Sequence, residues 1–84
     1  MHMGRFVEHA FRTMGEMRAV FDAIPEYDIA VVATLHENIQ KTRALYVSAA
    51  ATAGSAPVRD MLDTIIRMCD AIAFVSGARL AGQK

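Results

Sequence analysis

The sequence contains no tryptophan, only one cysteine and only two prolines, and its positive and negative charges cancel. The single cysteine, Cys69, excludes a disulfide within the chain, and a lone thiol in an apolar stretch is typical of a core residue in a reducing compartment. Nucleic-acid-binding proteins usually carry a basic excess on one face, so nucleic acid is not an expected partner. We therefore expect a cytoplasmic protein that is stabilised without a disulfide.

No apolar run is long enough to cross a membrane. The longest uncharged stretch, residues 44–58, falls short of the roughly 20 residues that a membrane helix requires, and Gly54 and Pro57 interrupt it. The N-terminus also lacks the charged segment, apolar core and cleavage site of a secretory signal. The sequence therefore predicts neither a membrane partner nor secretion.

Apolar side chains are what the chain has in abundance, at 54% of its 84 residues, with many alanines and methionines. Alanine and methionine favour helices. A chain of this length forms one domain, residues 1–84, and a single core of that size is marginally stable without a disulfide, a metal or a partner.

Apolar spacing predicts three helices, at residues 3–24, 26–53 and 56–76. In the first, apolar residues recur at alternating intervals of four and three, and Pro25 ends the helix. Gly54 ends the second helix, Ser55 is the predicted N-cap of the third, and Gly77 is its predicted end. The core-facing residues of the first two helices are Met3, Val7, Ala10, Met14, Met17, Phe21 and Ile24, and then Val32, Leu35, Ile39, Thr42, Tyr46, Ala49 and Ala53.

These helices predict an all-α fold, either a three-helix antiparallel bundle or a helical hairpin that self-associates. Apolar residues on the first and third helices span nearly twice the arc of about 100° that one core requires. We expect this surplus to form the interface of a homodimer or higher homo-oligomer, or to receive a helix of a partner protein. Alternatively, it lines a wide groove within one chain. The expected interface residues are Phe6, Phe11, Met14, Met61, Met68, Phe74 and Val75.

The sequence contains no strong catalytic, nucleotide or metal-binding motif. The glycines are isolated, so no phosphate-binding loop is expected, and the acidic residues lie beside arginines on outward faces. Metal ligands on a helix typically recur three or four positions apart, and His36 has no ligand residue at those spacings. We therefore expect no metal, no cofactor and no enzymatic activity.

One segment, Leu35-His36-Glu37-Asn38-Ile39-Gln40, resembles the phosphoacceptor box of sensor histidine kinases of the dimeric helical-hairpin type. The resemblance covers about six residues, and an apolar segment, residues 29–34, replaces the arginine-rich lead-in of that family. It implies that His36 is phosphorylated and that Glu37 assists.

The position of His36 also permits a structural role. It lies at the edge of the apolar stripe of its helix, where a flanking polar residue sits at a border between helices. Two functions follow from these observations. The first is a small regulatory or adaptor protein that works as a homo-oligomer through apolar helix faces, and the alternative is a histidine phosphotransfer-like or other helical catalytic module.

Overall fold

The computed structural model describes the backbone of residues 2–82 and the side chains of residues 8–82, so the predicted interface residue Phe6 lies outside the described side chains. Helix α1 spans His2–Ala23, a 3-10 turn η1 spans Ile24–Glu26, α2 spans Ile29–Ala51 and α3 spans Ala56–Ala81. The described residues contain no strand. The all-α prediction is confirmed.

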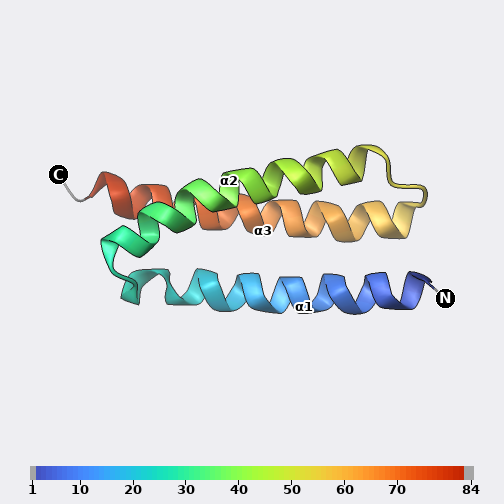
Figure 1. Cartoon of the computed structure of the whole chain (residues 1–84), viewed down its shortest axis with the longest axis horizontal. Coiled ribbons are helices and arrows are strands. Elements are labelled where there is room, and N and C mark those ends of the chain that lie inside the picture. The colour runs from blue at the N-terminus through green and yellow to red at the C-terminus, as the bar shows by residue number, and fades with distance from the viewer. Residues whose placement is uncertain (1, 83–84) are drawn as a thin grey trace.

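Helix α2 crosses α3 in Figure 1, so its second half lies on the side of α3 away from α1, whereas its first half lies toward the end of α1. Both α1 and α2 pack mainly against α3, and the α2–α3 seam is the more extensive of the two. Successive helices run in opposite directions, and the Cα atoms fill an elongated envelope of 48 × 21 × 15 Å. The result is an open antiparallel three-helix arrangement.

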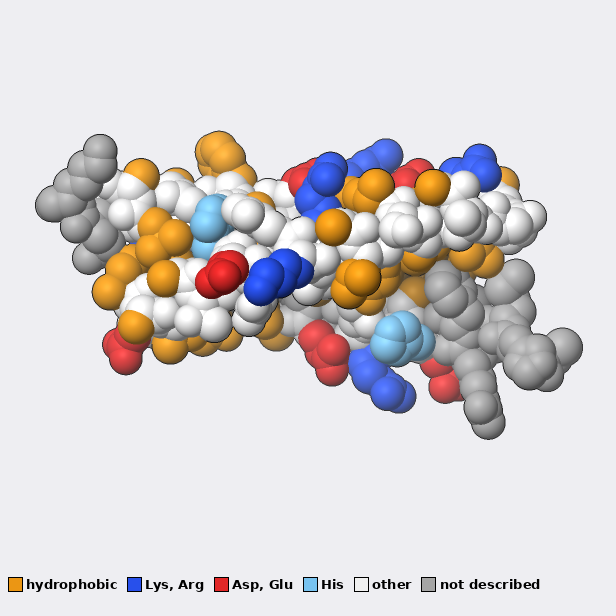
Figure 2. All heavy atoms as spheres, turned by 45° about the horizontal axis from the view of Figure 1, so that its top comes forward, with side chains coloured by type: hydrophobic (Ala, Val, Ile, Leu, Met, Phe, Trp, Pro, Cys, Tyr) orange, Lys and Arg blue, Asp and Glu red, His pale blue; other side chains and the backbone are white. Residues whose placement is uncertain are grey.

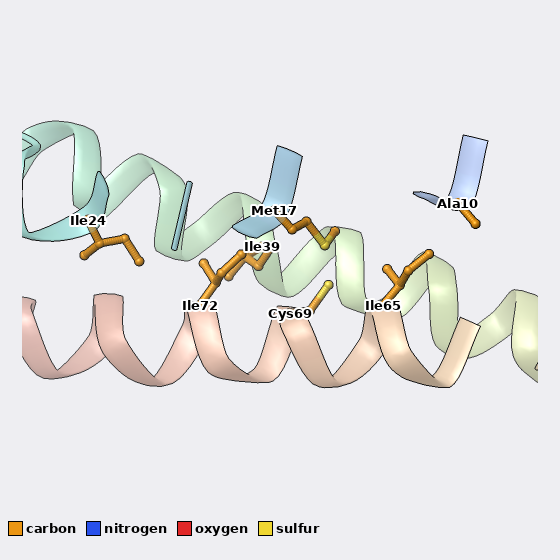
Figure 3. Packing of buried hydrophobic residues seen from close by; sticks show 7 residues of the cluster. All are labelled: Ala10, Met17, Ile24, Ile39, Ile65, Cys69 and Ile72. Carbon is orange, nitrogen blue, oxygen red and sulfur yellow. The ribbon is translucent and has the colours of Figure 1, made fainter. Parts of the chain in front are cut away.

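The core runs along the inner face of α3. Helix α1 and the 3-10 turn after it contribute one residue every seven positions, Ala10, Met17 and Ile24, as the sequence spacing predicts. Figure 3 shows them on the side that faces the isoleucines of α2 and α3. Each fully buried isoleucine stabilises the fold by roughly 1.5–3 kcal/mol. The buried apolar residues are Ala10, Met17, Ile24, Val32, Ile39, Leu62, Ile65, Cys69 and Ile72.

Helix α2 ends at Ala51, two residues before the predicted end, and two other helix boundaries differ from the prediction by more. Pro25 lies at the start of the 3-10 turn, where the absence of its amide proton breaks no hydrogen bond. Asp28 is the N-cap of α2, which therefore begins at Ile29 rather than at residue 26. Helix α3 continues through Gly77 to Ala81 instead of ending near Ser76. A glycine within a helix costs only about 1 kcal/mol relative to alanine, and packing against α2 offsets that cost.

Ser55 is the N-cap of α3, as the sequence predicts, but its hydroxyl forms no capping hydrogen bond. The Oγ atom of Ser55 is buried and has no hydrogen-bond partner among the described residues. The α3 N-terminus is thus positioned by the backbone, with the Arg59 amide donating to the Ser55 carbonyl over 3.0 Å.

Candidate functional site

His36 is held in the seam between α2 and α3 by a chain of hydrogen bonds. Its Nδ1 lies 2.8 Å from Ser76 Oγ, and its Nε2 lies 3.1 Å from Gln40 Nε2. The amide nitrogen of Gln40 can only donate, so His36 Nε2 accepts and Nδ1 carries the proton. Ser76 Oγ accepts that proton's hydrogen bond and donates its own to the Ala73 carbonyl over 3.2 Å. Each polar atom named in this chain of hydrogen bonds therefore has a partner.

Gly77 leaves space for the imidazole of His36 to pack against α3. A Cβ atom added at Gly77 would lie 3.1 Å from His36 Cε1, closer than most real Cβ contacts. The absence of a side chain therefore lets the ring pack directly on the α3 backbone. Sequence reasoning missed Ser76 and Gly77 as partners of His36, because it placed the end of the helix there.

Glu37, the predicted helper of His36, points to a different partner. Its carboxylate forms an ion pair of 3.8 Å with Lys41 on the solvent side of α2, and both side chains are 73% exposed. Exposed ion pairs of this kind contribute well under about 1 kcal/mol. Phosphorylation of His36 at Nε2 would require Gln40 to release that nitrogen.

A second polar contact crosses the α2–α3 seam. The Nε atom of Arg43 donates to Asp70 Oδ1 over 2.5 Å, with both side chains about half exposed. Next to Asp70, Cys69 is buried in the core, and this burial, together with the charge of Asp70, raises the pKa of its thiol against the opposing effect of Arg43. Cys69 therefore stays a neutral thiol at physiological pH and is a packing residue.

Arg79 ties the corner between α1 and α2 to the last turns of α3. Its guanidinium Nη1 donates to the Ile24 carbonyl over 2.7 Å and also to the Tyr27 carbonyl. These carbonyls belong to the first residue of the 3-10 turn and to the residue that follows it, so the contact fixes the direction in which α2 leaves the corner. A positive charge near the C-terminus of α3 is also favourable to the helix dipole.

An apolar groove opens between α1 and α2 at the end of the molecule that Arg79 fixes. The groove has a volume of about 580 Å³. Val20 and Tyr27 form one wall, and residues of the first three turns of α2 form the other. Its lining residues are Val20, Tyr27, Ala30, Val31, Thr34, Leu35 and Asn38.

The same side of α2 carries an uncharged stripe that continues past the groove. Its residues alternate at intervals of four and three, which keeps them on one side of a helix. Four of its members are exposed, among them Val31 at 48% and Leu45 at 72%, and the other two are half-buried. We call it the α2 outer stripe, and it consists of Val31, Leu35, Asn38, Thr42, Leu45 and Ala49.

The predicted interface residues of α1 and α3 occupy two kinds of environment. Met14, Met61, Met68 and Val75 are half-buried and pack against the core. Phe11 and Phe74 are exposed, at 63% and 77% respectively.

These residues do not gather on one side of α3. Met61, Met68 and Val75 recur every seven residues and share one side. Phe74 lies about 120° around the helix from Met68. Figure 2 likewise shows hydrophobic side chains reaching the surface at several separate places among isolated charged groups.

A smaller hollow, of about 300 Å³, lies between α1 and α3. Met17, Phe21 and Met68 form its apolar part. Arg18 and Asp22, which pair over 3.5 Å on the exposed side of α1, form its rim. This hollow is bounded by charges, whereas the groove beside α2 has no charged residue in its lining.

Within residues 2–82, no helix is both long and apolar enough to traverse a lipid bilayer, and no three His, Cys, Asp or Glu side chains gather as a metal site would require. No protein-family model matches the chain, and searches of curated proteins and of solved structures found nothing similar to it. The class that the fold defines is an all-α helical bundle, and its function must be inferred from its own surface.

Proposed function

We propose that the protein is a small helical interaction protein, of the regulatory or adaptor kind, that acts as a homo-oligomer through an apolar helix face. The observation that carries this proposal is the α2 outer stripe beside the groove. Leu45 is 72% exposed and Val31 is 48% exposed, and no charged residue interrupts the stripe between them. Depletion of charge at the centre is the compositional mark of protein–protein interfaces.

The amount of exposed surface supports the same proposal. The chain exposes 5664 Å². A compact folded monomer of this mass exposes about 4,900 Å². The difference, about 760 Å², is close to the roughly 800 Å² that each partner buries in a stable protein–protein interface. One such contact would bring the exposed surface to the value of a compact protein.

A cytoplasmic location belongs to the proposal as well. The only cysteine is buried and free, which fits a compartment where thiols stay reduced. An adaptor of this kind would need no cofactor.

Phosphotransfer through His36 is the second candidate, and one observation favours it. Ser76 accepts a hydrogen bond from His36 Nδ1, which leaves Nε2 unprotonated and bonded only to the exposed amide of Gln40. The test is incubation with a small acyl phosphate followed by detection of an acid-labile phosphoryl group. Label that appears on the wild type and is lost in His36→Asn would support this candidate, and an unlabelled wild type would exclude this donor chemistry.

Light scattering at low micromolar concentration tests the interaction proposal. We expect the wild type to have at least twice the monomer mass, and Leu45→Asp to shift it to the monomer while circular dichroism stays helical. Val47→Asp is the matched control, because Val47 is also exposed but lies about 160° around α2 from Leu45. A monomeric wild type with full helicity and a cooperative melt would overturn the proposal.

A further inference from the structure

We propose that the groove beside α2 receives α2 of a second copy, in antiparallel orientation, about a two-fold axis that passes between Asn38 and Thr42, at the level of residue 40. This inference rests on the proposed function and names the partner at that surface. It is carried by the spacing of the α2 outer stripe, by the shape of its two ends and by the charges next to it.

The spacing of the stripe is the same in both directions along the helix. Its intervals are four, three, four, three and four residues. An antiparallel second copy centred on residue 40 therefore meets every position of the stripe with another stripe position. In a two-fold interface each contact occurs twice, with the roles of the copies exchanged. The pairs are Val31 with Ala49, Leu35 with Leu45, and Asn38 with Thr42.

The two ends of the stripe differ in shape, and the two-fold operation brings the unlike ends together. Val31 and Leu35 line the groove of about 580 Å³. Leu45, ten residues further along, projects into solvent with 72% of its surface exposed. At 1.5 Å per residue these features lie about 15 Å apart on one copy. In the antiparallel pair, Leu45 of each copy lies over the groove of the other.

The centre of the stripe is polar, and this fixes its alignment. Asn38 has an amide and Thr42 a hydroxyl, so each can both donate and accept hydrogen bonds. Facing each other across the axis, they satisfy one another, while a shift along the helix would set either beside a leucine. A single polar position in an otherwise apolar helix seam specifies register in this way.

The charges that flank the stripe favour the antiparallel orientation. Glu37 and Lys41 lie on the solvent side of α2. In the antiparallel pair each Lys41 lies between Glu37 of its own copy and Glu37 of the second copy. A parallel pair would place the Glu37–Lys41 pairs of the two copies on opposite sides of the seam, where they gain no attraction between copies.

Disulfide cross-linking tests the orientation. We propose two single variants, Val31→Cys and Ala49→Cys, with native Cys69 kept in place because it is fully buried. An equimolar mixture, exchanged and then oxidised, should form a disulfide-linked dimer that contains one chain of each. Each variant alone should form none, since like positions lie about 27 Å apart in the antiparallel pair and a disulfide requires Cα atoms within about 7 Å.

A charge reversal gives a second measurement. Glu37→Lys and Lys41→Glu should each weaken association several-fold, and the double exchange should restore it. The matched control is Arg18→Glu with Asp22→Arg, because that exposed pair lies on α1 at the same four-residue spacing. The control should leave association unchanged.

The outcomes separate this inference from the proposed function. A disulfide between two Val31→Cys chains would show parallel pairing and overturn the inference. A wild type that is oligomeric by light scattering, yet forms no mixed disulfide, would overturn it too while the proposed function stands. A monomeric wild type would overturn both.

Discussion

The two seams on either side of α3 are built differently. Polar contacts cross the α2–α3 seam at His36 with Ser76 and at Arg43 with Asp70. Gly77 on α3 also allows the His36 ring of α2 to approach closely. Within residues 8–82, no side-chain hydrogen bond joins α1 itself to α3. Apolar packing holds α1, and Arg79 binds only the corner that follows it.

The α2–α3 seam fixes the relative position of its helices, whereas the α1–α3 seam mainly holds its helices together. Hydrogen bonds with fixed geometry allow α2 and α3 one relative position, because a shifted pair would leave buried polar groups unsatisfied. Methionine-rich packing adapts to several positions at similar energy. The α2–α3 hairpin is therefore the rigid platform of the molecule, and it carries the α2 outer stripe.

The largest expected effect comes from removing the main anchor of α1. Met17→Ala should lower the free energy of unfolding by about 2–5 kcal/mol, because Met17 is buried in the core. Hydrogen exchange should accelerate more in α1 than in the middle of α2 and α3. Equal acceleration in all three helices would mean that the two seams do not differ in strength.

An intermediate effect is expected from the hydrogen-bond chain. Ser76→Ala leaves Nδ1–H of His36 without its partner in a part-buried seam and should destabilise the protein by about 1–3 kcal/mol. Chemical denaturation measures the loss, and Ser48→Ala, on the exposed side of α2, should change stability by under about 0.5 kcal/mol. In a His36→Leu background the Ser76→Ala cost should shrink, since the two residues act on one bond. Additive costs would contradict the coupling.

The smallest effect compares two helical glycines. Nothing lies within 4 Å of a Cβ built at Gly15, so Gly15→Ala should stabilise the protein by roughly 0.5–1 kcal/mol. Gly77→Ala should lose that gain, because the new Cβ meets the His36 ring at 3.1 Å. Thermal melts of both variants give the comparison. In a His36→Ala background, Gly77→Ala should stabilise the protein as Gly15→Ala does. Equal stabilisation by the two substitutions in the wild type would contradict the close packing of His36 against Gly77.

The helices were predictable from sequence because their signals are local. Pro25 and Gly54 interrupt otherwise continuous apolar spacing, and the seven-residue repeat of the α1 core residues is visible in the sequence. Gly77 was misjudged for a physical reason. A glycine in isolation weakens a helix, but here contact with the His36 imidazole on α2 decides the outcome, and no property of residues near Gly77 reveals that contact.

The surface was harder to predict than the core. The sequence places the apolar surplus on the first and third helices, where Phe11 and Phe74 are exposed, but it does not single out Val31 and Leu45 on α2, which are exposed as well. The sequence assigns Leu35, Thr42 and Ala49 to the core face of the second helix, but in the structure Leu35 and Thr42 are half-buried and Ala49 is exposed. All three belong to the α2 outer stripe, which lies beside the buried stripe of Val32 and Ile39. Only the packing of α3 determines which of the two stripes is covered.

The contacts of Arg79 also bear on the order of folding. They join parts of the chain that are 55 and 52 residues apart, whereas only four residues separate α2 from α3. Contacts between distant residues require the closure of a long loop, so they form after local ones and slow folding. We expect the hairpin of α2 and α3 to be structured in the transition state and α1 to dock afterwards. Substitutions in the hairpin should then slow refolding, while those in α1 and at Arg79 should mainly speed unfolding.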